Sequence, residues 1–190
     1  MKINKSIVSL LCIAGSCLIG NVQAEEPKKA GALIFLCGEE NTTPIGTATL
    51  VEHSSDEGIK QVDVNITITS GLTAGKHGVH IHEVASCTPC GDAKGHFDPG
   101  PESNSNPDGN HPYHAGDLNN INIEQNGIGI LQTTTSRVTL SEGPLNIFDE
   151  NGSAFIIHTN ADSYCPEGVV AGCAGGSRDA CGIIYPLVSE

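Results

Sequence analysis

Apolar residues recur along this chain mainly in short segments, and the clearest segment alternates strictly between apolar and polar positions. Residues 62–69 read Val-Asp-Val-Asn-Ile-Thr-Ile-Thr, an unbroken period of two. Successive side chains of a strand point to opposite faces, so this segment is expected to be an antiparallel strand with one face on a core. Further apolar segments of strand length, separated by Gly, Asn and Pro, lie at residues 32–37, 46–51, 77–83, 121–124, 127–134, 154–159 and 182–188.

These segments predict an all-β fold, and no apolar helical periodicity lasts more than a few turns. Eight short strands separated by turn residues are typical of an antiparallel sandwich or barrel. Two irregular stretches, at residues 84–116 and 160–178, interrupt the pattern. Loops of this length are uncommon in compact domains unless they are functional, and histidines flank both of them. We therefore expect the chemistry of the protein in these two loops.

Composition narrows the class of protein. Of 190 residues, 9 are Lys or Arg and 22 are Asp or Glu, which gives a net charge of −13 with neutral histidines. A nucleic-acid-binding protein needs a basic face to neutralise phosphates, so this balance argues against that class. Charged residues make up only 16 % of the chain, which argues against a disordered polyelectrolyte.

The first residues have the pattern of a secretory signal. Two lysines precede a short apolar stretch, and Val22-Gln23-Ala24 offers small residues at a cleavage position. We expect a signal peptide at residues 1–24 and one domain at residues 25–190, hence an exported, periplasmic or extracellular protein. The apolar run is too short for stable insertion in a membrane. Lipidation of Cys17 is a weaker alternative, because no Leu lies three residues before it.

Six cysteines follow the expected signal peptide, and an even number in an exported chain predicts disulfides. The alternative is a thiolate metal site, but a zinc ribbon needs two close cysteine pairs and the sequence has one. The six are Cys37, Cys87, Cys90, Cys165, Cys173 and Cys181.

Histidines provide the strongest chemical signal. Six of the eight gather around the two loops: His80, His82, His96, His111, His114 and His158. A strand places His80 and His82 on one face, where two imidazoles can bind one metal ion. His114 and Asp117 add an imidazole and a carboxylate three residues apart. Such N and O donors suit zinc, copper or iron, whereas the absence of His-Glu-x-x-His disfavours a zinc protease.

Five motifs resemble the copper/zinc superoxide dismutase family in the same order along residues 32–188. They are Gly-Val-His-Ile-His-Glu at 78–83, Gly-His-Phe-Asp-Pro at 95–99, His-Ala-Gly-Asp-Leu at 114–118, His158 with Asp162, and Gly-Ser-Arg-Asp-Ala-Cys-Gly at 176–182. The resemblance implies a Greek-key β-barrel. It also implies an enzyme that converts the superoxide anion to oxygen and hydrogen peroxide, with a copper ion that alternates between two oxidation states.

The resemblance also assigns a role to individual residues. Asp162 would link a copper histidine to a zinc histidine, and Arg178 would attract the substrate anion beside the copper. His96 would be shared by both ions and would carry a proton to the peroxide. Copper would be held by His80, His82, His96 and His158, and zinc by His96, His114 and Asp117. The family pairs a loop cysteine with the one that follows Gly-Ser-Arg, which implies a disulfide between Cys87 and Cys181.

The chain departs from the family pattern in its loops. Residues 100–110 lack the expected zinc histidine, so His111 is the remaining candidate for that ligand. The alternative is that His111 faces solvent and the zinc shell is incomplete. Residues 160–177 contain no lysine, although family members commonly carry lysines there. Cys165 and Cys173 could close a small loop of their own, which leaves Cys37 and Cys90 unassigned.

Two functions remain open at this point. The first is a superoxide dismutase that acts on the superoxide anion, with a homodimer as a possible assembly. The second is a non-catalytic module of the same fold that stores or delivers copper and zinc. Arg178 and Asp162 favour the enzyme, because a metal carrier needs neither.

Overall fold

The computed structural model describes residues 7–13, 16–22, 28–38, 43–100, 104–109 and 114–188, with the first two stretches described for the backbone alone. His111 lies outside the described residues. Strands β1 (Ile7–Ile13) and β2 (Ser16–Val22) pair antiparallel in a sheet of their own. The main sheet contains β3 (Lys29–Leu36), β4 (Gly46–Ser54), β5 (Lys60–Ile68), β6 (Gly75–His77), β7 (Val79–His82), β8 (Ile121–Ile123), β9 (Gly129–Thr135), β10 (Ala154–His158), β11 (Arg178–Ile183) and β12 (Tyr185–Leu187).

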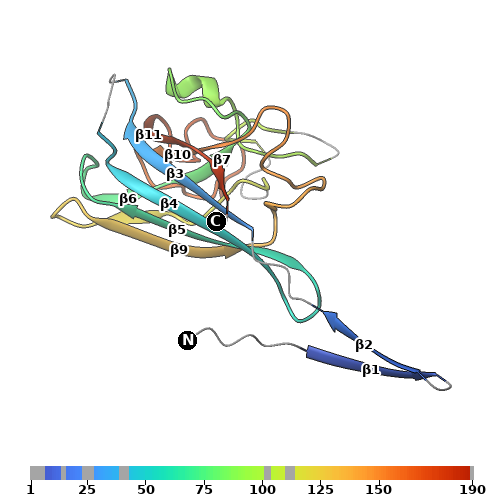
Figure 1. Ribbon diagram of the computed structural model, residues 1–190. Helices are drawn as coiled ribbons and strands as arrows, with labels where there is room; N and C mark the ends of the chain where they lie inside the picture. Colours follow the sequence, from blue (N-terminus) through green and yellow to red (C-terminus); the bar gives the residue numbers. More distant parts are fainter. Residues whose placement is uncertain are drawn as a thin grey trace.

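The main sheet curls into a nearly closed barrel (Figure 1). Its order is β6-β8-β9-β5-β4-β3-β11-β10-β7, with β12 added beside β3, and the pairs between its strands are antiparallel. Strands β6 and β7 are the two edges of this order, yet only Gly78 separates them in the chain. The sheet must therefore curve until its edges approach each other. The predicted all-β antiparallel class is confirmed.

The core is aliphatic and lies inside the curled sheet. On β5 the apolar positions of the alternating segment, Val62, Val64, Ile66 and Ile68, are fully buried, whereas the residues between them are partly exposed. Burial of such side chains contributes about 1.5–3 kcal/mol each relative to leaving them in water. The same alternation recurs on β4 and β9, which flank β5. Hydrophobic burial therefore fixes the register of the strands.

Two predicted strands are divided in the structure. The segment at 77–83 is split at Gly78 into the end of β6 and the whole of β7, because the two parts belong to opposite sheet edges. The segment at 182–188 contains the end of β11 and the short β12. Within the loop at 84–116 lies the 3-10 helix η1 (Cys90–Ala93).

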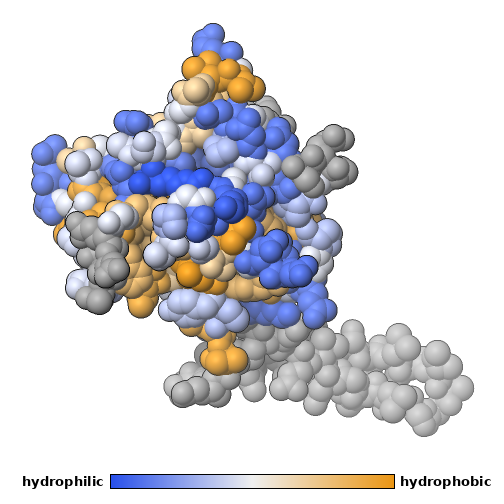
Figure 2. Space-filling view, turned by 90° about the horizontal axis from the view of Figure 1, so that it is seen from above, coloured by the Kyte–Doolittle hydropathy of each residue, from blue (hydrophilic) through white to orange (hydrophobic). Residues whose placement is uncertain are grey.

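The surface view mixes hydrophilic and hydrophobic side chains on the face that it shows (Figure 2). Among the described residues, no helix is long and apolar enough to span a membrane.

Candidate metal centre

Strand β7 carries the first two histidines of the site and is buried on both faces. Val79 and Ile81 face the core, and His80 and His82 face the opposite side. All four side chains are nevertheless fully buried. The loop at 84–116 pairs with the free edge of β7: the Ile81 N–H donates to Gly116 O over 2.8 Å, and the Phe97 N–H donates to Ile81 O over 2.9 Å. A Cβ at Gly116 would lie 2.2 Å from Ile81 O, so only glycine permits this contact.

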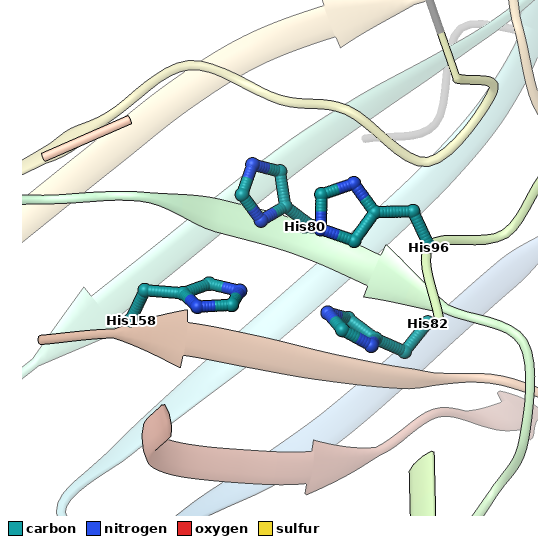
Figure 3. Close-up of side chains that lie close together, drawn as sticks. All are labelled: His80, His82, His96 and His158. Atoms are coloured by element: carbon teal, nitrogen blue, oxygen red, sulfur yellow. The ribbon is translucent and has the colours of Figure 1, made fainter. Parts of the chain in front are cut away.

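Two further histidines converge on this pair from different elements. His96 comes from the loop at 84–116, and its backbone forms an isolated antiparallel β-bridge with that of His82. His158 is the last residue of β10, where the register with β11 shifts. The ring centroids of His80 and His158 are 4.9 Å apart, and those of His82 and His96 are also 4.9 Å apart. Figure 3 shows the four rings turned toward one another, and one ligand atom from each lies within 4.8 Å of the others.

The tautomers of His82 and His158 follow from their hydrogen bonds. His82 Nδ1 lies 2.9 Å from Lys94 O, and His158 Nδ1 lies 2.9 Å from Gly176 O. A carbonyl oxygen only accepts, so each Nδ1 must donate its proton and each Nε2 must carry a lone pair. Both Nε2 atoms are buried and have no hydrogen-bond partner. Buried nitrogen lone pairs that converge in this way fit a metal ion, and four imidazoles suit copper.

A second group of donors adjoins the first and shares His96 with it. His96, His114 and Asp117 are buried, and one ligand atom from each lies within 4.8 Å of the others. His96 Nδ1 is 2.7 Å from Asp117 Oδ1, and His114 Nδ1 is 3.2 Å from Asp117 Oδ2. Two imidazoles and a carboxylate form a donor set that fits zinc.

Asp162 supports the site from outside. Its Oδ2 lies 2.8 Å from His80 Nε2, and both side chains are fully buried. Asn120 holds the backbone of Asp162 on both sides: Asn120 Nδ2 donates to Asp162 O over 2.9 Å, and the Asp162 N–H donates to Asn120 Oδ1 over 2.8 Å. The aspartate is thereby fixed against the histidine, as a partner that orients a metal ligand must be.

Burial favours the neutral form of three of the four clustered histidines, His80, His82 and His158. It lowers the pKa of His80 to about 3, against an opposing effect of Asp162, and lowers the pKa of His158 to about 4. The pKa of His82 is also well below its usual value because of burial. A neutral imidazole is the form that binds a metal, so these rings are ready for an ion at neutral pH.

Arg178 lies beside His158 in the wall of a hollow. Its guanidinium donates to Cys90 O over 2.7 Å and also to Lys94 O. Burial lowers its pKa from the usual value, but a guanidinium stays charged in proteins. The hollow has a volume of about 350 Å³ and is lined by Pro107, Asp108, His158, Gly172, Ala174, Gly176, Ser177 and Arg178. A small anion that enters it meets a fixed positive charge next to a histidine of the site.

Disulfides attach the loops to the barrel. Cys87 is bonded to Cys181 on β11, which is the pairing that the family resemblance implies. Cys37 is bonded to Cys90, and Cys165 to Cys173. Because Cys90 O accepts a hydrogen bond from Arg178, the Cys37–Cys90 bond holds one of the two carbonyls that position the guanidinium.

The structure thus brings together the histidines, carboxylates and arginine that the sequence singles out, apart from His111, which lies outside the described residues. Sequence reasoning missed Asn120 and the carbonyl groups of Lys94 and Gly176. Asn120 belongs to no recognised motif, and backbone carbonyls leave no signal in a sequence. Their roles arise only when the two loops meet over β7.

A nearly closed antiparallel barrel with two adjoining histidine-rich donor groups defines the class as an all-β metalloprotein. The family model described as copper/zinc superoxide dismutase matches residues 44–184. The chain belongs to this family.

Similar proteins include some named as Cu-Zn superoxide dismutases and one named as superoxide dismutase-like. The chain is 36 % identical over 159 residues to a Cu-Zn superoxide dismutase of Deinococcus radiodurans, covering 76 % of this chain and 74 % of the relative. It is 35 % identical to a Cu-Zn superoxide dismutase of Aquifex aeolicus, covering 85 % and 89 %. A superoxide dismutase-like protein of Bacillus subtilis, YojM, is 34 % identical over 70 % of this chain and 66 % of its own length. A solved double mutant of a SOD-like protein from that organism has a TM-score of 0.61 and 30 % identity, covering 84 % of this chain and 97 % of the other.

Proposed function

We propose that this protein is a superoxide dismutase that converts two superoxide anions and two protons to one molecule of oxygen and one of hydrogen peroxide. The observation that carries this proposal is that Arg178 and His158 line the same hollow. The four-histidine group alone would serve a metal carrier equally well. A half-buried guanidinium, anchored by two carbonyl groups beside that group, is what a reaction on a small anion requires.

The residues that would hold the two ions follow from the two donor groups. Copper, when bound, supplies the alternation between two oxidation states, and zinc, which has no redox chemistry, orders the loop and polarises the shared ring. The copper ligands in this proposal are His80, His82, His96 and His158, and the zinc ligands are His96, His114 and Asp117. His111 is proposed as a further zinc ligand.

Arg178 binds and orients the substrate. Two carbonyl oxygens, of Cys90 and Lys94, fix the guanidinium, so the side chain loses little conformational freedom when an anion arrives. The net charge of the chain is −13, and this general field repels superoxide. Screening weakens that repulsion beyond about 8–10 Å at physiological salt, so the charge inside the hollow decides the approach.

His96 holds and releases a proton. Its Nδ1 lies against the Asp117 carboxylate, and its Nε2 is buried on the side of the other three histidines. In this proposal Nε2 takes up a proton in the first half of the cycle and gives it to the departing peroxide in the second. Asp162 keeps the adjacent His80 ring in place throughout.

We further propose that the chain is exported, with residues 1–24 as a signal peptide and residues 25–190 as the functional domain. Three disulfides support an oxidising compartment, because such bonds are rare where thiols are kept reduced.

A non-catalytic module that stores or delivers metal is the second candidate, because one relative is named only as superoxide dismutase-like. One experiment separates the two functions. Purified protein loaded with copper and zinc is analysed for metal content and is assayed for superoxide consumption. Rapid consumption that depends on copper supports the enzyme. Full occupancy of both metals without superoxide consumption would overturn the proposed activity, and the metal-storing or metal-delivering module would be the remaining candidate.

A further inference from the structure

Asp108 joins the two loops that wall the hollow. Its Oδ2 accepts a hydrogen bond from the Gly172 N–H over 2.8 Å, and its Oδ1 accepts one from the Ala174 N–H over 3.2 Å. Oδ1 also lies 3.6 Å from Sγ of Cys173. Asp108 precedes Gly172 by 64 residues, so this single carboxylate ties the loop at 84–116 to the loop at 160–178.

The segment that Asp108 holds is constrained from its other side as well. The disulfide between Cys165 and Cys173 closes the stretch before it, and the Ser163 N–H donates to Cys173 O over 2.9 Å. The disulfide fixes the loop to itself, whereas Asp108 fixes it to the opposite wall. Asp108 therefore supplies the hydrogen bonds that hold residues 172–174 to the opposite loop.

The next residues of the same segment contact His158. Gly176 O accepts the hydrogen bond from His158 Nδ1 at 2.9 Å. Gly175 has φ +104, and a Cβ there would lie 2.7 Å from His158 Cβ, so its backbone packs directly on the histidine. Gly175 O and Ser177 O accept the backbone N–H groups of Asn160 and Thr159 over 3.0 and 2.8 Å, so a shift of Ala174 would alter, rather than abolish, the hydrogen bond between Gly176 O and His158 Nδ1.

The negative charge of Asp108 is unfavourable for the proposed substrate, which is an anion. The carboxylate lines the hollow together with Arg178, where a negative charge opposes the entry of an anion. Its two oxygens each accept a backbone N–H, a charge-assisted arrangement that is stronger than a neutral one and that an amide side chain cannot match with its single acceptor oxygen. A role in holding the wall explains why an acid is present there.

We infer that Asp108 is a positioning residue for the reaction: it clamps residues 172–174 and so sets the orientation of His158 and the width of the hollow. This inference rests on the proposed function for its link to turnover, although the clamp itself does not. Asp108 acts through Gly176 and His158 and makes no contact with the substrate.

Three variants of the full chain test the clamp: Asp108→Ala, Asp108→Asn and, as a matched control, Glu167→Gln. Glu167 is an exposed acid in the same disulfide-closed loop, so its variant removes the same charge without touching the clamp. The first measurement is hydrogen exchange of the Gly172 and Ala174 amides in the metal-free protein. We expect exchange about tenfold faster or more in Asp108→Ala, a smaller increase in Asp108→Asn, and wild-type rates in Glu167→Gln.

The second measurement is the electron paramagnetic resonance spectrum of the protein loaded with copper(II). We expect the hyperfine pattern to change in Asp108→Ala, to move part of the way in Asp108→Asn, and to stay unchanged in the control. A merely structural role would change the melting temperature without changing this spectrum. In steady-state assays, the loss should appear in kcat as well as in KM.

Exchange rates within about twofold of wild type in Asp108→Ala, together with an unchanged copper spectrum, would overturn the inference. If Asp108→Ala does not fold, Asp108→Asn decides, and wild-type exchange at both amides in that variant overturns it equally. Exchange and spectrum are read without turnover. A wild-type protein that binds copper but consumes no superoxide would therefore refute the proposed enzyme while leaving the test of the clamp intact.

Discussion

The carboxylate of Asp117 lies between two imidazoles, with its Oδ1 2.7 Å from Nδ1 of His96. Its Oδ2 lies 3.2 Å from Nδ1 of His114 and accepts the His114 backbone N–H over 3.0 Å. A ring nitrogen that donates to this carboxylate must lose its proton before it can bind a metal ion. Metal uptake through Nδ1 therefore requires each proton to leave that nitrogen, to Nε2 of the same ring or to solvent, and Asp117 is the acceptor that orients both rings toward one point.

The first prediction concerns zinc. Asp117→Asn keeps the size of the side chain but removes its charge, so we expect zinc affinity to fall at least about tenfold while copper binding is retained. Metal analysis after competition with a chelator measures both. The control is Glu142→Gln, which removes an exposed negative charge from a residue outside both donor groups. Zinc retention equal to that of the control would show that the group of His96, His114 and Asp117 is not the zinc site.

Periodicity and spacing predict the parts of this fold that depend on local sequence. The alternation at 62–69 predicts β5, because one buried face leaves a period of two in the sequence. The spacing of His80 and His82 likewise predicts two imidazoles on one strand face. The division at Gly78 is not predictable in the same way, since nothing local distinguishes one long strand from two strands at opposite edges of a curled sheet.

The supporting contacts of the site depend on tertiary structure alone. Asn120 and Asp162 are 42 residues apart, and the Cys37–Cys90 bond spans 53 residues. No periodicity relates residues at such separations, and six cysteines allow many pairings. The family resemblance implied Cys87–Cys181 and left Cys37 and Cys90 unassigned. Their pairing follows from contacts with β11: η1, which contains Cys90, contacts this strand, and the Cys37 N–H donates to Asp179 O on it.

The second prediction concerns Arg178. Arg178→Ala removes the fixed charge in the hollow, so we expect the second-order rate constant for superoxide to fall about tenfold or more and to lose part of its salt dependence. Arg178→Lys should recover part of the rate, because it restores the charge without the planar donor geometry. Pulse radiolysis at several ionic strengths measures both effects. Lys76→Ala removes an equal charge from an exposed position of β6 and should have little effect. Equal rates for Arg178→Ala and Lys76→Ala would refute the steering role.

The third prediction ranks two disulfides by the length of chain that they close. Cys87 and Cys181 are 94 residues apart, whereas Cys165 and Cys173 are 8 apart. The chain-entropy relation gives about 4–5 kcal/mol for the long loop and about 2–3 kcal/mol for the short one. We expect the Cys87→Ser/Cys181→Ser double variant to lose more unfolding free energy in urea than Cys165→Ser/Cys173→Ser. The reverse order would mean that strain or residual structure in the unfolded chain outweighs loop entropy.

The fourth prediction concerns Glu52, a buried carboxylate on β4 that belongs to neither donor group. It accepts hydrogen bonds from the Leu140 N–H at 2.6 Å and from the Ser141 N–H and Oγ at 2.9 and 3.0 Å, and Lys60 Nζ lies 3.0 Å away. These bonds fasten the connection between β9 and β10 to the sheet. An amide cannot accept as many, so Glu52→Gln is expected to lose about 2–4 kcal/mol of unfolding free energy at neutral pH.

That loss should depend on pH. Burial of Glu52 opposes its ionisation, but the hydrogen bonds from Ser141, Lys60 and Leu140 outweigh it, and the pKa in the folded state is lowered from the usual 4.5. A carboxyl group with a lowered pKa stabilises the fold fully above its unfolded pKa and loses that contribution as pH falls through the folded pKa. The difference between wild type and Glu52→Gln should therefore be largest at neutral pH and shrink below about pH 4.5. Urea titrations at matched metal content measure it, with Glu142→Gln as the control, and a difference that is constant across this range would show that the ionised carboxylate is not the source of the stability.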